Sequence, residues 1–189
     1  MFILAYITFT FVNSQDDSRV YAIHRDVFSG FKSSQYTIYD PSEKNIRYRI
    51  ESEYGLRQNI KVIAYPSKQE VGRLQSKIKF FLYKAEISIF DPKTNQRNNG
   101  SIEQKYKFTG SLFYINSHGH RIKGEAEAFS LTTNFYNESE RLVAQVQRRR
   151  HLAFKRKYDL KIYSSKYPDQ IFLLGLAAYD SFSAAKGKG

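Results

Sequence analysis

The chain has 189 residues, a length typical of one domain, and 41% of them are hydrophobic, which is enough for a buried core. It contains no cysteine, so disulfides, thiolate nucleophiles and cysteine-ligated zinc sites are excluded. The formal net charge of +12 and the pI of about 9.7 favour anionic partners such as lipid, nucleic acid or acidic protein.

The N-terminal segment 2–12 is uncharged and mostly apolar. It is shorter than the roughly 20 residues that span a bilayer, but it has the length of the hydrophobic region of a secretory signal peptide, about 7 to 15 residues. We expect residues 1–14 to be a signal peptide, although Met1 is followed by no basic residue. The alternative is an edge strand, because 6–12 is rich in strand-forming residues. A cleaved signal implies a secreted or luminal protein, and a strand implies a cytoplasmic, membrane-associated one.

The middle of the chain alternates apolar and polar residues with the period of β-strands. The candidate strands are 46–50, 60–64, 74–84, 85–89, 106–109, 112–115, 122–129, 142–146 and 158–163. Turn-forming residues separate them at 40–41, 65–67, 91–92, 98–100, 117–119 and 137–138. Many short strands at this spacing predict a barrel or a sandwich.

Two Asn-x-Ser sequons lie in these predicted turns, at Asn99 and Asn137. Turns of a secreted protein tolerate glycans, so both are candidate glycosylation sites. Two matches in a chain of this composition are close to chance, and they add little to the prediction of secretion.

Residues 141–166 carry much of the net charge, with Asp159 as their single acid. If 142–148 pairs with 157–163, two dense basic clusters meet at one end of a hairpin, around the apolar residues Leu152 and Phe154. The clusters would attract anionic headgroups while Leu152 and Phe154 insert between lipids. The alternative is a solvated loop with Leu152 or Phe154 turned inward. The candidate anionic-ligand residues are Arg148, Arg149, Arg150, Lys155, Arg156 and Lys157.

The pattern changes at Tyr167-Pro168-Asp169, which reads as a stop followed by a helix N-cap. From Ile171 to Tyr179 the only polar side-chain group is the tyrosine hydroxyl. A helix that is apolar on every face must be buried on every face, and this one is too short to span a bilayer. We therefore expect a buried helix from Asp169 to about Phe182, wrapped by strands and followed by a frayed tail at 184–189.

The chain resembles the LURP-one-related family of the tubby C-terminal-like superfamily, to which the phospholipid scramblases also belong. Segments 35–40 and 46–50 are similar to the family's opening hairpin, and 142–149 is similar to its late strand. Residues 158–162 and the apolar helix that ends at Tyr179-Asp180 are similar to its closing strand and helix. The glycine that usually follows the hairpin aspartate is absent, since Pro41 and Asn45 stand in that turn.

The resemblance covers residues 30–183 and implies a mainly β fold. That fold is an antiparallel twelve-stranded barrel enclosing a central hydrophobic C-terminal helix. Residues 15–29 would then be an N-terminal extension. The resemblance also implies binding to membranes or phosphoinositides.

No catalytic, metal-binding or cofactor-binding motif occurs, and we expect a monomeric, noncatalytic protein without cofactors. His118-Gly119-His120 reads as a turn rather than a metal site. The first functional hypothesis is a module that binds anionic lipid or phosphoinositide at a membrane surface. The second is a secreted or luminal interaction protein that binds a partner protein or a polyanionic glycan. Nucleic acid ranks below both, because no recognition motif accompanies the charge.

Overall fold

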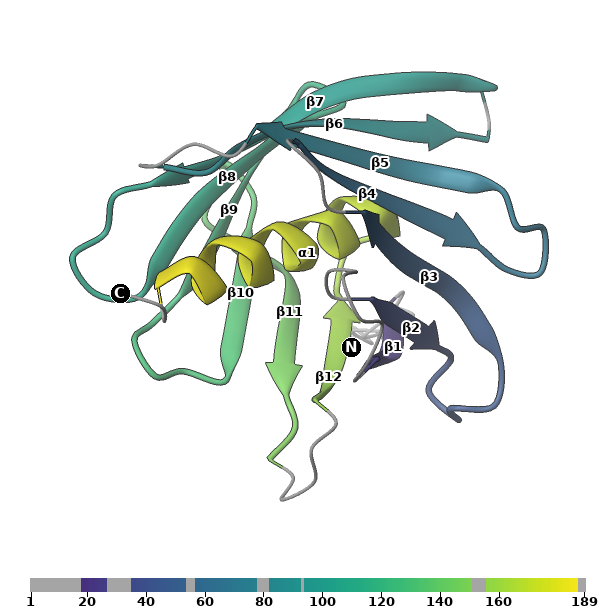
Figure 1. Ribbon diagram of the computed structural model, residues 1–189, viewed down its shortest axis with the longest axis horizontal. Helices are drawn as coiled ribbons and strands as arrows, with labels where there is room; N and C mark the ends of the chain where they lie inside the picture. Colours follow the sequence, from purple (N-terminus) through teal and green to yellow (C-terminus); the bar gives the residue numbers. More distant parts are fainter. Residues whose placement is uncertain are drawn as a thin grey trace, which may run out of the picture.

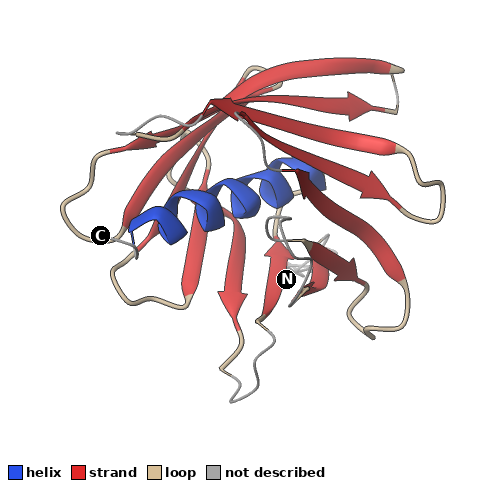
Figure 2. Cartoon of the chain, in the orientation of Figure 1, coloured by secondary structure: helices blue, strands red, loops and turns tan. Residues whose placement is uncertain are grey.

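The computed structural model describes residues 18–26, 35–53, 57–77, 82–92, 94–150 and 156–186. In these ranges the chain forms twelve strands and one helix, α1 (Asp169–Lys186) (Figures 1 and 2). The strands are β1 (Arg19–Arg25), β2 (Tyr36–Tyr39), β3 (Ile46–Glu53), β4 (Arg57–Ala64), β5 (Glu70–Lys77), β6 (Lys84–Asp91), β7 (Gln96–Lys105), β8 (Ser111–Ser117), β9 (His120–Ala126), β10 (Thr132–Tyr136), β11 (Leu142–Arg148) and β12 (Lys157–Ile162).

The strands form one closed antiparallel barrel in which each strand pairs with its neighbours in the sequence. β1 closes the ring by pairing with β12, with Arg19 opposite Ile162 and His24 opposite Lys157. The predicted twelve-stranded barrel is therefore confirmed.

Alternation along each strand decides which side chains face the interior. In β6, Ala85, Ile87 and Ile89 are buried, whereas Glu86 between them is exposed. Because successive side chains of a strand point to opposite faces, this pattern gives an apolar inner wall and a polar outer one.

The helix α1 lies across the inside of the barrel (Figure 1), and all its residues from 171 to 178 are buried. Phe172 packs edge-on against Phe135 of β10, with ring centroids 5.3 Å apart. Gly175 permits a close approach, because a Cβ there would lie 2.8 Å from Ile115 and 2.9 Å from Phe135. The prediction of an enclosed helix is confirmed. In the described part of the chain, no helix is both long enough and apolar enough to cross a bilayer.

The structure corrects the predicted N-terminal boundary of the barrel. We expected residues 15–29 to be an extension, but β1 lies within them and contributes the strand that joins β12 to β2. The predicted signal peptide 1–14 lies outside the described residues.

Five local predictions are also wrong. The strand expected at 122–129 ends at Ala126, so 127–129 lie in a loop. Residues 106–109 follow β7 as a loop rather than a strand, and the expected turn at 98–100 lies within β7. The run 74–84 is divided between the end of β5 and the start of β6. α1 extends to Lys186, so the tail expected from 184 is partly helical. Alternation of apolar residues locates strands better than their ends, because turn-forming residues also occur inside strands.

Candidate functional site

The β11–β12 hairpin brings the two predicted basic clusters to one end of the barrel. Arg148 is opposite Tyr158, and the Arg149 backbone N donates to the Lys157 carbonyl at 2.9 Å. We call residues 148–150 and 156–157 the hairpin end. The predicted hairpin is confirmed, while Leu152, Phe154 and Lys155 lie outside the described residues.

The remaining cations of segment 141–166 do not join this cluster. Arg141 precedes β11, and Lys161 and Lys166 lie at or beyond the end of β12. A seven-residue strand is about 20 Å long at about 3.3 Å per residue. The charge that is continuous in the sequence is therefore divided between the two ends of the hairpin.

Two of the predicted ligand residues are held by carboxylates. The Arg149 guanidinium donates to both oxygens of Asp159, through Nε at 3.0 and 2.8 Å, and reaches Glu43 at 2.5 Å through Nη1. Lys157 Nζ lies 3.1 Å from the second Glu43 oxygen, which also faces His24 Nε2 at 2.8 Å. We call Glu43, Arg149, Asp159 and Lys157 the clasp, which ties the β2–β3 turn to the hairpin.

The clasp changes the ionisation of its members. Hydrogen bonds from Arg149 and then from Lys157 lower the pKa of Glu43 to about 2. Hydrogen bonds to Asp159 and then to Glu43 raise the pKa of Arg149 above its ordinary value. Both shifts favour the charged forms, so the clasp is an ion-pair network at neutral pH.

The other described cations of the hairpin end are open to solvent. Arg148, Arg150 and Arg156 are exposed, and none forms an ion pair with the described part of the chain. Arg148 and Arg150 border a groove of about 690 Å³ between β11 and the β9–β10 loop. Phe129, Ser130 and Thr132 line its other side. Arg149 and Asp159 of the clasp also line the groove, and because they neutralise each other, Arg148 and Arg150 are the groups that could bind an anion there.

We predict that Glu43→Gln will lower the stability at neutral pH by about 1 kcal/mol, the scale of a partly exposed ion-pair network. The ordinary glutamate pKa is about 4.3, above that of folded Glu43. The contribution of Glu43 is therefore complete above about pH 4.3 and is lost as the pH falls toward 2. Urea denaturation of both proteins across this range should show the stability difference shrinking with acidification.

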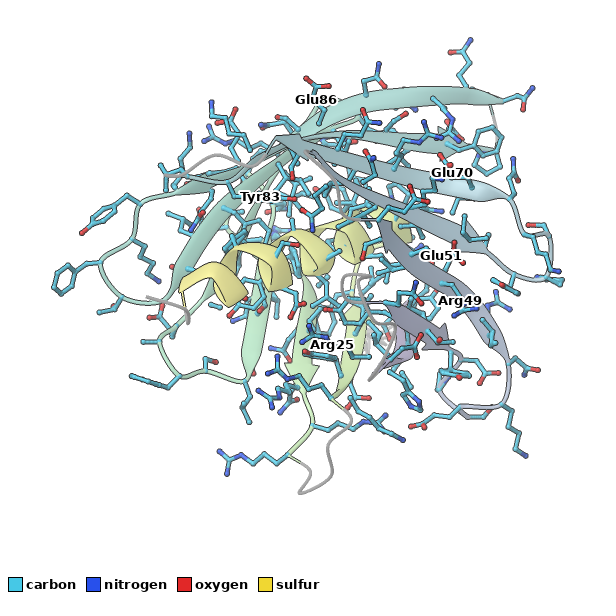
Figure 3. All side chains as sticks on the ribbon, viewed as in Figure 1. Arg25, Arg49, Glu51, Glu70, Tyr83 and Glu86 are labelled. Atoms are coloured by element: carbon cyan, nitrogen blue, oxygen red, sulfur yellow. The ribbon has the colours of Figure 1, made fainter. Side chains whose placement is uncertain are left out.

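Glu86→Gln is the matched control for this experiment. Glu86 is exposed on β6, and Figure 3 shows it on the outside of the barrel away from the hairpin. Its substitution should change stability by about 0.5 kcal/mol or less. A Glu43→Gln effect that persists unchanged to pH 2 would contradict the role of the Glu43 charge.

The sequence analysis did not predict that three aromatic residues, Tyr106, Phe108 and Phe129, would be exposed on the surface. All three were expected in strands, but Tyr106 and Phe108 lie in the β7–β8 loop and Phe129 lies in the β9–β10 loop. Tyr106 and Phe108 are 77% and 90% exposed, and Phe129 is fully exposed. Gly110 was the signal available in the sequence, because an isolated glycine between apolar segments often marks a turn, and in the structure it has a positive φ.

The two sequons differ in their structural setting. Asn99 is exposed but lies inside β7 opposite Ser88, not in the predicted turn. Asn137 begins the turn before β11, where its Oδ1 accepts from the backbone N of Ser139 and of Arg141, each at 3.0 Å. Glycosylation at either position stays a prediction.

The histidine pair forms the turn that the sequence predicted. His118 and Gly119 connect β8 to β9, both at positive φ. His118 Nδ1 lies 2.8 Å from Ser117 Oγ, and burial lowers the pKa of His118. His120 Nδ1 lies 3.6 Å from the Glu138 carboxylate. The described residues contain no group of three or more histidine or acidic side chains placed to hold a metal ion.

Together these features define a closed antiparallel barrel around a buried C-terminal helix, with a basic hairpin at one end. A sequence model of the LURP-one-related proteins matches residues 19–179, more than four fifths of the chain. The chain belongs to the LURP-one-related family. The match begins at the first residue of β1, in agreement with the role of that strand in the barrel. Comparisons with curated proteins and with solved structures found no match.

Proposed function

We propose that this domain is a noncatalytic module that binds anionic lipid or phosphoinositide at a membrane surface through the hairpin end. The observation that carries the proposal is the presence of three exposed arginines, Arg148, Arg150 and Arg156, at one end of the barrel, two of which, Arg148 and Arg150, border a groove. Exposed arginine favours phosphate because its planar guanidinium can donate two parallel hydrogen bonds to phosphate oxygens.

The clasp gives the predicted ligand residues different roles. Arg149 and Lys157 are engaged by Glu43 and Asp159, so they position the hairpin. Arg148, Arg150 and Arg156 are free to meet headgroups. Each basic residue near an anionic surface contributes about 1 kcal/mol, so three together support about a hundredfold change in membrane affinity.

The proposal is tested by replacing Arg148, Arg150 and Arg156 with Gln in the full chain. Binding to vesicles of phosphatidylcholine with phosphatidylserine, or with a phosphoinositide, should weaken by about a hundredfold in a co-sedimentation assay. Neutral phosphatidylcholine vesicles should bind neither protein. Binding by the parent should weaken at 1 M salt, where screening acts over about 3 Å instead of about 8 Å.

The same hairpin provides a control that removes an equal charge. Gln at Arg141, Lys161 and Lys166 leaves the hairpin end intact and lowers the net charge equally. This variant should keep most of the vesicle affinity. Equal loss in both variants would show that net charge, not the hairpin end, drives binding. Equal binding of the hairpin-end variant and the parent would overturn the proposal.

A further inference from the structure

Tyr106, Phe108 and Phe129, the most exposed aromatic residues in the described part of the chain, lie on loops at the same end of the barrel as the basic hairpin. Ser111, which begins β8, pairs with Ala126, which ends β9, so the loops 106–110 and 127–131 are adjacent. Thr132, which begins β10, pairs with Gln147 near the end of β11. Figure 1 shows these loops and the end of β11 along the left and lower rim. We call 106–110 and 127–131 the aromatic loops.

The aromatic loops are fixed to each other. Lys107 of the first loop lies 2.7 Å from Glu125, near the end of β9, and 2.8 Å from Glu127 of the second loop. Gly110 has φ of +78°, and a Cβ there would lie 2.3 Å from the Ala126 carbonyl oxygen. The two loops are therefore adjacent and connected by an ion pair, and they present their aromatic side chains to solvent on the same side.

The backbone of Phe129 is unusual for an aromatic residue. Its φ is +59°, in the left-handed region that disfavours bulky side chains. Packing of the ring does not compensate for this backbone strain, because the ring is fully exposed. A strained backbone that holds an apolar ring in solvent is consistent with a functional role for that ring.

We propose that the aromatic loops are a membrane anchor in which Tyr106, Phe108 and Phe129 insert into the headgroup region of an anionic bilayer. This inference rests on the proposed function. It adds an apolar contact with the bilayer, made by these three residues, to the contacts of the arginines. Aromatic side chains prefer the boundary between headgroups and acyl chains. The groove places Phe129 beside Arg148 and Arg150, so ring and guanidinium groups would engage one membrane surface together.

The charge at this end of the barrel favours an anionic bilayer, rather than a second copy of the chain, as the partner of the aromatic loops. The free cations Arg148, Arg150 and Arg156 lie at the same end as the aromatic loops. Two such ends facing each other would repel, whereas an anionic bilayer attracts them.

The absence of tryptophan makes insertion directly measurable. Phe108→Trp and Phe129→Trp each create a protein with a single indole. Vesicles containing phosphatidylserine should shift its emission to the blue, and brominated lipids should quench it. Tyr163→Trp is the control, because Tyr163 follows β12 at the opposite end of the barrel. Its emission should not change with vesicles.

Phe129→Gly separates the proposed role from a structural one. Glycine adopts positive φ freely, so the melting temperature should stay the same or rise. Loss of the ring should weaken vesicle binding by about tenfold or more. Asn95→Gly is the matched control, since Asn95 has φ of +54° in the β6–β7 turn at the other end. It should leave binding unchanged.

The outcomes distinguish the anchor from the proposed lipid binding. Vesicle binding without an emission shift at either aromatic loop would overturn the anchor and leave the proposed function standing. Absence of any vesicle binding would overturn both. An emission shift that grows with protein concentration in the absence of vesicles would assign the aromatic loops to self-association and overturn the anchor.

Discussion

Leu176→Asp is expected to abolish cooperative folding of the domain. Leu176 is buried in the middle of α1, where the neighbouring Gly175 is in close contact with Ile115 and Phe135. A carboxylate at this position would be desolvated among apolar side chains, at a cost of several kcal/mol. Since domains of this size are stable by only about 5 to 15 kcal/mol, most or all of the stability would be lost. Circular dichroism during thermal denaturation measures the effect.

Two milder substitutions on the same helix provide the scale. Leu176→Met conserves volume and should cost less than about 1.5 kcal/mol. Leu174→Ala removes a fully buried side chain and should cost about 2 to 5 kcal/mol through the cavity that it leaves. A soluble Leu176→Asp protein with a cooperative transition would contradict the enclosed position of the helix.

Much of the fold follows from the sequence because two signals are local. The uninterrupted apolar run from Ile171 to Ala178 requires burial on every face of a helix, and only a surrounding wall satisfies that requirement. Alternation such as that of β6 identifies the wall as strands. The number of strands and their closure came from the family resemblance rather than from these patterns.

β1 could not be placed from local patterns. Its single apolar stretch, 20–23, is short, and its partner β12 lies more than 130 residues later in the chain. Pairing over that separation is determined by closure of the barrel, which no short window of sequence contains.

The basic cluster at the hairpin end was also only partly predictable from the sequence. Its location at one end of the hairpin follows from pairing of 142–148 with 157–163, and the sequence predicts it. The sequence does not show that Glu43, 106 residues away, engages Arg149. The number of basic residues in the sequence therefore locates the hairpin end but overestimates how many of its cations lack an ion-pair partner.

Asp169 forms the connection between the start of α1 and the barrel wall. Its carboxylate is buried and lies 2.7 Å from the Arg19 guanidinium. The hydroxyls of Tyr21 and Tyr48 donate to it at 2.5 and 3.0 Å. Burial, followed by the negative charge of Asp169, raises the pKa of both tyrosines. One side chain thus joins β1, β3 and α1.

Asp169→Ala is expected to cost about 3 to 5 kcal/mol, because it removes the counter-charge of Arg19 and the acceptor of the Tyr21 hydroxyl, which is buried, and of the Tyr48 hydroxyl, which is partly buried. Asp169 is the first residue of α1 rather than the predicted N-cap before it, so the loss also includes the attraction between its charge and the N-terminus of the helix, about 0.5 kcal/mol. Urea denaturation at neutral pH, fitted with a common slope, measures it. The apolar face of α1 remains, so the variant should still fold, in contrast to Leu176→Asp.

Asp169→Asn separates the two contributions to this loss of stability, the ion pair and the hydrogen bonds. The amide oxygen still accepts from the hydroxyls of Tyr21 and Tyr48, but the ion pair with Arg19 is removed, so we expect an intermediate loss of stability. Arg19→Met tests the ion pair from the other side, since it leaves the buried Asp169 carboxylate without its counter-charge. If β1 were only an extension outside the fold, Arg19→Met would change stability by less than about 0.5 kcal/mol. A large effect of Arg19→Met, together with that of Asp169→Ala, is the result expected if β1 and α1 depend on each other for their positions in the barrel.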